Sequence, residues 1–504
     1  MMHLGIDLGT TYSLVAQVNP HGQPALFPDA LNASQFRTPS VVYIGAEGTL
    51  VGMAAEELLD DAPELPVARF VKTHLADAAW RHPDHLGRGW SAEALSALVL
   101  RKLLKDADAF AGEDIGTVVL TVPAQFTEEQ RRATLRAAAM AGLERVTLVE
   151  EPVAAASFYG LDEGPRDRTL LVYDFGGGTF DVTVLQTAAE GLFVLATDGI
   201  ADLGGRIIDQ RLVEALQRDF QSNYSRLRLN DAGNVQRLRR LAEDSKIKFA
   251  KPGLNQVRQA LLLAGQPFEA LITRAQFDAV AGPAVEQTLA VCTRCLRSAS
   301  LSWADVDKIV LTGGSSLLPQ VVPTLAEASG KTARDIVAKQ PHQAVAFGAA
   351  LLASRLAADP QGDSAIAPAA TADLCLRTWD ARHQRPDLET LIARNTPLPA
   401  RYARTFYTNR DDQTRLVLEF VQRRHDPDEE HSLGHFAFGP IRRPRRNMPI
   451  EVAVILGRDG LLHATARDAE SGDEIAHTLS GDAAGKAAPS LEQRHLVESV
   501  QINV

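Results

Sequence analysis

Short apolar runs bounded by glycine recur through the first 200 residues, and longer stretches with helical spacing of apolar positions lie between them. Their length and their content of branched residues predict strands. The predicted strands are Leu4–Leu8, Ser13–Val18, Val41–Ile44, Thr117–Val122, Thr169–Tyr173, Val182–Leu185 and Leu192–Ala196. Helices are predicted over 92–110 and 128–141, the second beginning at a capping-box pair, Thr127 and Gln130. Strands mixed with helices in this way indicate an α/β architecture.

The same pattern continues to about residue 356. A charged helical stretch covers 205–250, a strand is predicted at 257–263, and a long helix is predicted at 273–299. A last strand at 308–311 runs into a glycine pair. Cys292 and Cys295 fall inside the long helix, and Cys375 is the only other cysteine, so a buried reduced pair is expected rather than a zinc or redox site.

The character of the sequence changes after residue 356. Residues 357–372 are rich in alanine, proline and glycine and predict a linker. Short alternating strands then follow at 403–408, 414–421, 450–456 and 461–466, with Asp459-Gly460 as a tight turn before the last one. The expected division is an α/β unit over 1–356, the linker over 357–372, an all-β unit over 373–482, and a short tail over 483–504 that has no helical lid.

Composition narrows the class of protein. Apolar residues make up 45% of the chain and charged residues 23%, which is ordinary globular usage and argues against long disorder. A net charge of −11 provides no general attraction for nucleic acid, and the arginine clusters at 423–424 and 442–446 are interpreted as solvated loops. Without a run of eighteen apolar residues or a charged leader, the chain is expected to be cytoplasmic, with no membrane partner.

The strongest chemical signal is a near-repeat of one turn. Asp7-Leu8-Gly9-Thr10-Thr11 follows the first strand, and Asp174-Phe175-Gly176-Gly177-Gly178-Thr179 follows another. Glycines let backbone N–H groups approach an anion, and the threonine hydroxyls can donate further hydrogen bonds. Two such turns can hold a polyphosphate between them. Asp7 and Asp174 then require a divalent cation between carboxylate and phosphate oxygens, Mg²⁺ held through coordinated water being the expected form.

These motifs resemble the actin-like ATPases, and more closely the seventy-kilodalton heat-shock chaperone family (DnaK-like chaperones). Stretches that carry the resemblance occur in order over about residues 3–355: 5–13, 122–126, 151–156, 173–181, 203–205 and 311–315. The resemblance implies a two-lobed, actin-like (ribonuclease-H-like) ATPase that binds ATP or ADP with Mg²⁺, and it allows for K⁺ as well. It also implies slow ATP hydrolysis and a role in protein folding and the stress response.

Site residues follow from the resemblance, position by position. Those at the phosphates are Asp7, Gly9, Thr10, Thr11, Tyr12, Gly176, Gly177, Gly178 and Thr179. The catalytic and cation network consists of Lys72, Glu151, Asp174, Thr179 and Asp181, with Lys72 orienting the attacking water. A surface position is the alternative for Lys72. Catalysis of this kind relies on positioning and charge, so no activated serine or cysteine is needed.

The nucleoside end of the site follows the family less closely. Residues matched there are Gly204, Gly205, Glu243, Lys246, Gly313, Gly314 and Ser315. Leu317 stands where the family has an arginine, and Ala250 where it has a serine. The acidic pairs after Gly205 and after Pro341 are replaced by Arg206-Ile207 and His342-Gln343.

Residues 391–468 resemble the peptide-binding β-sandwich of the same family. Its pocket positions fall on Phe406, Leu416, Leu418 and Leu461, although core positions of a sandwich would give the same spacing. The expected groove wall, 375–386, carries charges where the family is apolar, and the linker lacks the leucines that usually dock on the ATPase.

Three functions remain open on sequence alone. The first is an ATP-driven chaperone that controls the binding of unfolded or extended polypeptide, together with a J-domain co-chaperone and a nucleotide-exchange factor. The second is a nucleotide-switched adaptor with little hydrolysis and one dedicated protein partner. The third is a small-molecule kinase of the actin-like fold, for which a C-terminal sandwich would have no use.

Overall fold

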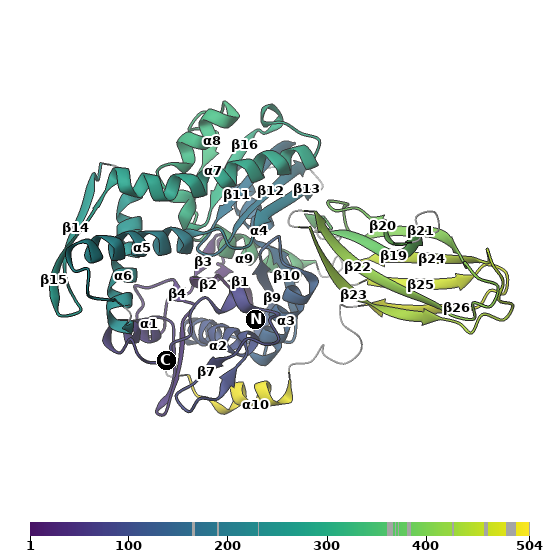
Figure 1. The fold of residues 1–504 in the computed structure, drawn as a ribbon, viewed down its shortest axis with the longest axis horizontal. Helices are drawn as coiled ribbons and strands as arrows, with labels where there is room; N and C mark the ends of the chain where they lie inside the picture. Colours follow the sequence, from purple (N-terminus) through teal and green to yellow (C-terminus); the bar gives the residue numbers. More distant parts are fainter. Residues whose placement is uncertain are drawn as a thin grey trace.

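The chain forms two α/β lobes and an elongated β unit at one side of them (Figure 1). The computed structural model describes residues 1–163, 167–188, 191–229, 231–251, 253–359, 366–367, 369–370, 372–380, 385–425, 428–457, 462–479 and 490–502.

The first lobe is built on a sheet with the strand order β10-β9-β1-β2-β3. Strand β1 is antiparallel to β2 and parallel to β9. These strands are β1 (Met2–Asp7), β2 (Tyr12–Val18), β3 (Pro24–Leu26), β9 (Ile115–Val122) and β10 (Val146–Glu150), and β4 (Thr38–Pro39) also pairs with β2. The helices are α1 (Met53–Asp61), α2 (Ala92–Ala111) and α3 (Glu128–Met140), with two hairpins, β5 (Val42–Gly45)–β6 (Gly48–Val51) and β7 (His82–Pro83)–β8 (Gly89–Trp90).

The second lobe repeats that strand order as β17-β16-β11-β12-β13. Its strands are β11 (Arg168–Phe175), β12 (Phe180–Ala188), β13 (Gly191–Ile200), β16 (Lys308–Thr312) and β17 (Ile336–Val337), with β14 (Gln256–Leu263) and β15 (Gln266–Thr273) as a separate hairpin. Its helices are α5 (Gly205–Asn223), α6 (Ala232–Phe249), α7 (Arg274–Ser298) and α8 (Val321–Ser329). A sheet order that occurs twice, with antiparallel strands first and parallel ones after, is the duplication expected of the actin-like fold.

Helices α4 (Glu151–Glu163) and α9 (Ala344–Ala358) lie between the two sheets and share one apolar core with both. Their crossing is close: a Cβ atom on Gly348 would lie 1.7 Å from the carbonyl oxygen of Ala154. On the other side of α9, a Cβ on Gly5 would lie 2.0 Å from the backbone nitrogen of Ala350. Glycine is therefore required at both contacts.

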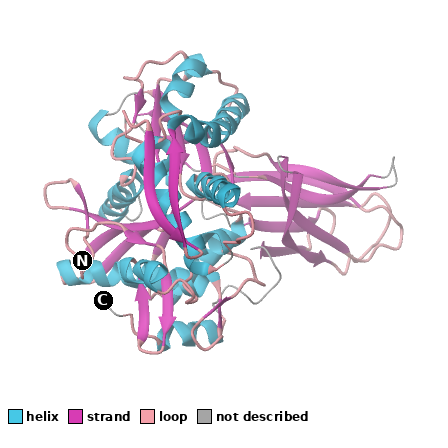
Figure 2. Cartoon of the chain, turned by 60° about the vertical axis from the view of Figure 1, so that its left-hand side comes forward, coloured by secondary structure: helices cyan, strands magenta, loops and turns pink. Residues whose placement is uncertain are grey.

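The β unit is a sandwich of two four-stranded sheets, ordered β20-β19-β22-β23 and β21-β24-β25-β26 (Figure 2). The strands are β19 (Asp373–Asp380), β20 (Arg385–Ile392), β21 (Ala400–Tyr407), β22 (Leu416–His425), β23 (Asp428–Phe438), β24 (Pro449–Leu456), β25 (Leu462–Asp468) and β26 (Glu474–Leu479). One apolar cluster fills the space between the sheets, around Phe420, Ile450 and Ala464, all fully buried.

Two further segments connect the sandwich to the lobes. Strand β18 (Ile366–Ala367) pairs in parallel with β13 and lengthens the sheet of the second lobe. Helix α10 (Leu491–Ser499) lies against α2 of the first lobe (Figure 1). The region interpreted as a short tail thus contains a packed helix.

The predicted fold class, an actin-like α/β unit followed by an all-β sandwich, is confirmed. Helix α3 has the predicted capping box. Cys292 and Cys295 are buried free thiols in α7, and burial raises the pKa of both. Within the described residues, the expected groove wall lies in β19 and the start of β20. Residues 381–384 of that wall and the Asp459-Gly460 turn lie outside the described residues.

Candidate functional site

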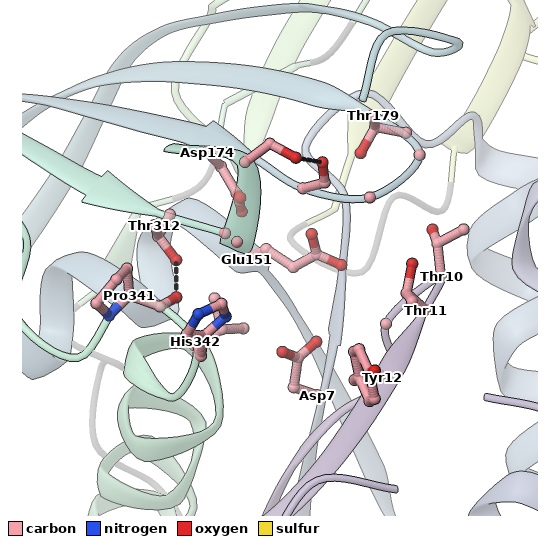
Figure 3. A pocket seen from close by; sticks show the side chains of 18 of the residues that line it. Asp7, Thr10, Thr11, Tyr12, Glu151, Asp174, Thr179, Thr312, Pro341 and His342 are labelled. Carbon is pink, nitrogen blue, oxygen red and sulfur yellow. Dashed lines mark hydrogen bonds between the residues drawn. The ribbon is translucent and has the colours of Figure 1, made fainter. Parts of the chain in front are cut away.

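A cavity of about 280 Å³ lies between the lobes, where strand ends from both sheets meet. Its walls come from the turn between β1 and β2, the turn between β11 and β12, the end of β16, and helix α6. Figure 3 shows the side chains of Thr10 and Thr11 on one side of this space and Asp174 and Thr179 on the other. The two copies of the sequence near-repeat therefore face each other across the cavity.

The two glycine-rich turns are in direct contact. A Cβ atom on Gly177 would lie 2.2 Å from Thr11 Oγ1, and one on Gly178 would lie 2.9 Å from Thr10 Cγ2. Any larger residue at these positions would push the turns apart. The glycines therefore allow threonine hydroxyls and backbone amides from both lobes to face the same space.

Gly204, Gly205 and Ser315 hold the second turn from behind. The backbone nitrogen of Gly205 donates to the carbonyl oxygen of Gly176 at 3.0 Å. The hydroxyl of Ser315 donates to the same oxygen at 2.7 Å. Ser315 also lines the cavity, together with Gly313 and Gly314, whereas Gly204 and Gly205 support the turn without lining the cavity.

Below the turns, one lysine and four carboxylates gather in the interior. Lys72, in a 3-10 helix over Val71–His74, is only 7% exposed, and its Nζ lies 2.5 Å from Glu151 Oε1. Asp7, Asp174 and Glu151 line the same cavity. Asp181 is 1% exposed, and its Oδ1 has no hydrogen-bond partner. Lys72 is thus an interior residue, which removes the alternative of a surface lysine.

The electrostatics of this cluster are unbalanced. Burial, followed by the neighbouring charge of Glu151, raises the pKa of Asp7 and that of Asp181 to about 7. Burial and the surrounding acids Glu151, Asp181 and Asp7 raise the pKa of Asp174 well above its usual value. Lys72 opposes all three shifts without offsetting them. One buried ammonium is therefore too little to keep all four carboxylates ionised at neutral pH.

This imbalance fits a divalent cation. Hard oxygen donors in excess, including the unpartnered Asp181 oxygen, are the donor set that Mg²⁺ prefers. In the described part of the chain, no three His, Cys, Asp or Glu side chains converge on a common point, so direct coordination by protein alone is not built in. The residues suit an ion shared with water and phosphate oxygens.

At the nucleoside end, the predicted residues are tied to lobe neighbours. Lys246 Nζ lies 2.5 Å from Asp209 Oδ2, and Glu243 Oε2 lies 4.0 Å from Arg69. Both line the cavity. Among the lining residues that the sequence analysis did not assign to it are Arg37, Ile247 and Thr312. Thr312 directly precedes the glycine pair, which was a usable signal. Arg37, whose guanidinium lies 4.8 Å from the Tyr12 ring centre, belongs to no motif.

The residues that depart from the family pattern differ in whether they line the cavity. The ring of His342 lies beside Gly314 and lines the cavity, with Pro341 held by Gly313 N and by Thr312 Oγ1. Leu317 and Ala250 are not among the residues that line it. The substitution at His342 thus alters the wall of the cleft itself.

In the sandwich, the predicted peptide-pocket positions within the described residues differ in burial. Leu418 is 3% exposed and belongs to the sandwich core, and Phe406 and Leu416 pack partly buried against that core. Leu461 lies outside the described residues. On the expected groove wall, Arg377 pairs with Glu419 at 3.1 Å and with Glu430 at 3.0 Å.

Arg423 and Arg424, interpreted from the sequence as part of a solvated loop, instead lie in strand β22. The arginine cluster at 442–446 has acidic neighbours. Arg442 Nε lies 2.8 Å from Asp473, and Arg445 pairs with Glu470.

None of the helices in the described ranges has the length and apolar character needed to cross a membrane.

The fold and the site together define an actin-like nucleotide-binding protein with a β-sandwich appended. Residues 57–499 match the family model described as "Hsp70 protein". The chaperone protein DnaK of Thermotoga neapolitana is 35% identical to this chain over 488 residues, which covers 95% of this chain and 80% of the relative. DnaK of Thermotoga maritima is 34% identical over the same length and coverage. The chain therefore belongs to the Hsp70 family, whose members are ATP-dependent chaperones.

Proposed function

We propose that this chain binds and slowly hydrolyses ATP in the cleft and uses the nucleotide state to control polypeptide binding in its sandwich. The observation that carries the proposal is the pair of glycine-threonine turns facing each other above the buried Lys72–Glu151 pair. Family membership favours this function over a small-molecule kinase.

In the proposed mechanism, the two turns bind the phosphates through backbone N–H groups and the hydroxyls of Thr10, Thr11 and Thr179. Lys72 positions the attacking water, and Glu151 fixes the orientation of the Lys72 ammonium through their 2.5 Å contact. Asp7, Asp174 and Asp181 would hold Mg²⁺ through water, and the ion would neutralise charge on the phosphates.

We further propose that the nucleotide-binding domain covers 1–356, the linker 357–372, and the sandwich 373–482. The separate sheets and cores of the lobes and the sandwich support this division. Unfolded or extended polypeptide is the proposed ligand of the sandwich. J-domain proteins and exchange factors are the proposed partners of the nucleotide domain.

Single-turnover ATP hydrolysis tests the proposal. We expect slow turnover by the native chain, acceleration by an extended apolar peptide, and a loss of about 100-fold or more in Lys72→Ala and Asp174→Asn. Lys251→Ala, at an exposed position after α6, is the control for removing a lysine.

The outcomes separate the chaperone from the adaptor. Tight nucleotide binding without turnover, and without a response to peptide, would reject the chaperone mechanism. That result would favour a nucleotide-switched adaptor with one dedicated partner, for which the paired charges around Arg377 provide the structural support.

A further inference from the structure

Residues 490–502 occupy a site on the first lobe that is far from them in sequence. Val497 of α10 is fully buried and Ile502 is 3% exposed, and both belong to the apolar core of the first lobe. Leu496 and Val500 pack against the same core. Figure 1 shows α10 beneath α2, at the side of the molecule opposite to β16 and α8. The segment therefore contributes core residues and is not a surface appendage.

Polar contacts fix the register of α10. Gln493, 7% exposed, accepts a hydrogen bond from the backbone nitrogen of Ser91 at 2.9 Å and donates to the carbonyl oxygen of Gly89 at 3.2 Å. Ser91 is the N-cap residue of α2. Backbone N–H groups at the N-terminus of a helix have no partner inside the helix. A single side chain thus satisfies one donor and one acceptor of the first lobe.

Two cationic side chains of α2 bind backbone carbonyl groups, one in the last turn of α10 and one after it. Arg101 donates to the carbonyl oxygen of Val497, and Lys105 Nζ donates to that of Ile502 at 2.9 Å. Carbonyl groups at a helix C-terminus lack intrahelical partners and carry partial negative charge, which cations stabilise. Side chains of α2 therefore recognise this end of the segment.

The last described residues add to a sheet. The backbone nitrogen of Thr49 donates to the carbonyl oxygen of Gln501 at 3.1 Å, and Thr49 pairs in parallel with Ile502. Thr49 belongs to β6 and is fully buried. The site therefore recognises a helix with one apolar face, followed by an extended residue that forms a single bridge with β6.

The other end of the sandwich is attached to the second lobe. Strand β18 pairs with β13 at Leu192 and Phe193. In the loop after β20, Asn395 Oδ1 accepts from Thr197 N at 3.2 Å, and Arg394 lies 3.3 Å from Asp198. The chain thus enters the sandwich from one lobe and leaves it to the other.

We propose that residues 490–502 are a built-in ligand of a groove formed by α2, β6 and the turn before α2, and that this contact is a second tether. With β18 on the second lobe and α10 on the first, the segments that precede and follow the sandwich are held by opposite sides of the nucleotide cleft. A change in the angle between the lobes is then transmitted to the sandwich through two attachments. The transmission rests on the proposed function, because it requires the lobes to respond to nucleotide, whereas the groove does not.

The groove is tested by cutting the tether in the full-length protein. A protease recognition sequence inserted between Leu479 and Ser490 releases the segment, whose retention is followed by size-exclusion chromatography. We expect the native fragment to stay bound, and Val497→Asp to release it at least about tenfold faster, because a carboxylate would enter an apolar core. Arg494→Ala, an exposed position on the same helix, is the matched control.

Gln493→Ala is the milder variant if Val497→Asp does not fold. It removes both contacts at the start of α2 and is expected to increase hydrogen exchange at Ser91 and along α10. Equal retention or equal release of the segment in the native protein and both variants would show that residues 490–502 are not recognised by the groove.

Transmission is tested with two pairs of spin labels in the uncut protein. One pair spans the lobes, and the other spans the first lobe and the sandwich, each measured with and without ATP. We expect both distances to change in the native chain. Val497→Asp and Gln493→Ala should keep the lobe change but alter the size of the sandwich change, because the sandwich then follows the second lobe alone.

The two hypotheses fail separately. If the lobe distance does not respond to ATP in the native protein, the nucleotide switch of the proposed function is wrong. If the lobe distance responds and the variants keep the native change at the sandwich, the second tether is wrong.

Discussion

Asp84 is a carboxylate that its neighbours make unusually acidic. Burial raises its pKa, but hydrogen bonds from the Trp90 ring, the Arg88 side chain and backbone N–H groups outweigh burial and lower the pKa to about 2. Its Oδ2 accepts from Arg88 Nε at 2.7 Å and from Trp90 Nε1 at 3.1 Å. Asp84 therefore organises the turn that also presents Gly89 and Ser91 to α10.

A carboxyl with a lowered pKa in the folded state stabilises the protein above its unfolded pKa, near 4. This stabilisation is lost as the pH falls toward 2. Asp84→Asn should therefore lower the free energy of unfolding by about 2 kcal/mol at pH 7, and the difference from the native protein should narrow below pH 4. Urea unfolding at pH 7, 5 and 3.5 measures this, with the exposed Asp219→Asn as control.

Gly177 is the point where the two glycine-threonine turns touch. Gly177→Ala would place a methyl group 2.2 Å from Thr11 Oγ1, so we expect ATP affinity to fall at least about tenfold. Adding Thr11→Ala removes the clashing oxygen, and the double variant should bind ATP no more weakly than Gly177→Ala alone. Calorimetric titration of the native protein and three variants gives the coupling; strict additivity would contradict a steric origin.

At the scale of elements, the crossing of α4 and α9 determines how closely the two lobes approach. Gly348→Ala would place its methyl group 1.7 Å from the carbonyl oxygen of Ala154 and should destabilise the protein by about 1–3 kcal/mol. Gly160→Ala, on α4 with open space around it, is the matched control and should be neutral or stabilising by up to about 1 kcal/mol. Chemical denaturation of both variants tests the contact. Equal effects would mean that the crossing is looser than described.

The sequence predicted elements well where one periodicity dominates a segment. Helices α2 and α3 and the central strands of both lobes have such patterns, and glycines beside acids marked both turns that face each other across the cavity. Strands β20 and β26 carry charged residues at exposed positions, which hide the alternation, and α10 is only nine residues long.

Contacts between distant segments were not accessible in the same way. Lys72 and Glu151 are separated by 79 positions, and Gln493 and Ser91 by 402, so no local spacing relates them. The position of Lys72 was predicted through family resemblance, and Arg37 was missed because no motif contains it.

For the whole molecule, one ion cluster joins the sandwich to the second lobe. Asp198, with its side chain 4% exposed, contacts Arg294 of α7 at 2.6 Å and Arg394 of the sandwich at 3.3 Å. Removing Arg394 leaves Asp198 paired inside the lobe, so the lobe should stay folded while the sandwich loses an attachment.

We therefore expect Arg394→Ala to weaken docking of the sandwich by about 1–2 kcal/mol, with little change in the melting temperature of the lobes. Small-angle scattering should show a larger radius of gyration. Arg404→Ala, which removes a pair with Glu389 inside the sandwich, is the control. An unchanged radius in Arg394→Ala would assign docking to the remaining contacts, among them β18, Asn395 and α10.

The duplicated strand order also has a consequence for the edges of the sheets. Equivalent edge strands, β3 and β13, end the two sheets, but they differ as templates for a further strand. β3 has three residues and begins with Pro24, which has no N–H to offer, whereas β13 has ten residues and accepts β18. Although the strand order is duplicated, only one of the two sheet edges accepts a strand from the described part of the linker. The asymmetry of the edges thus decides on which lobe the sandwich begins.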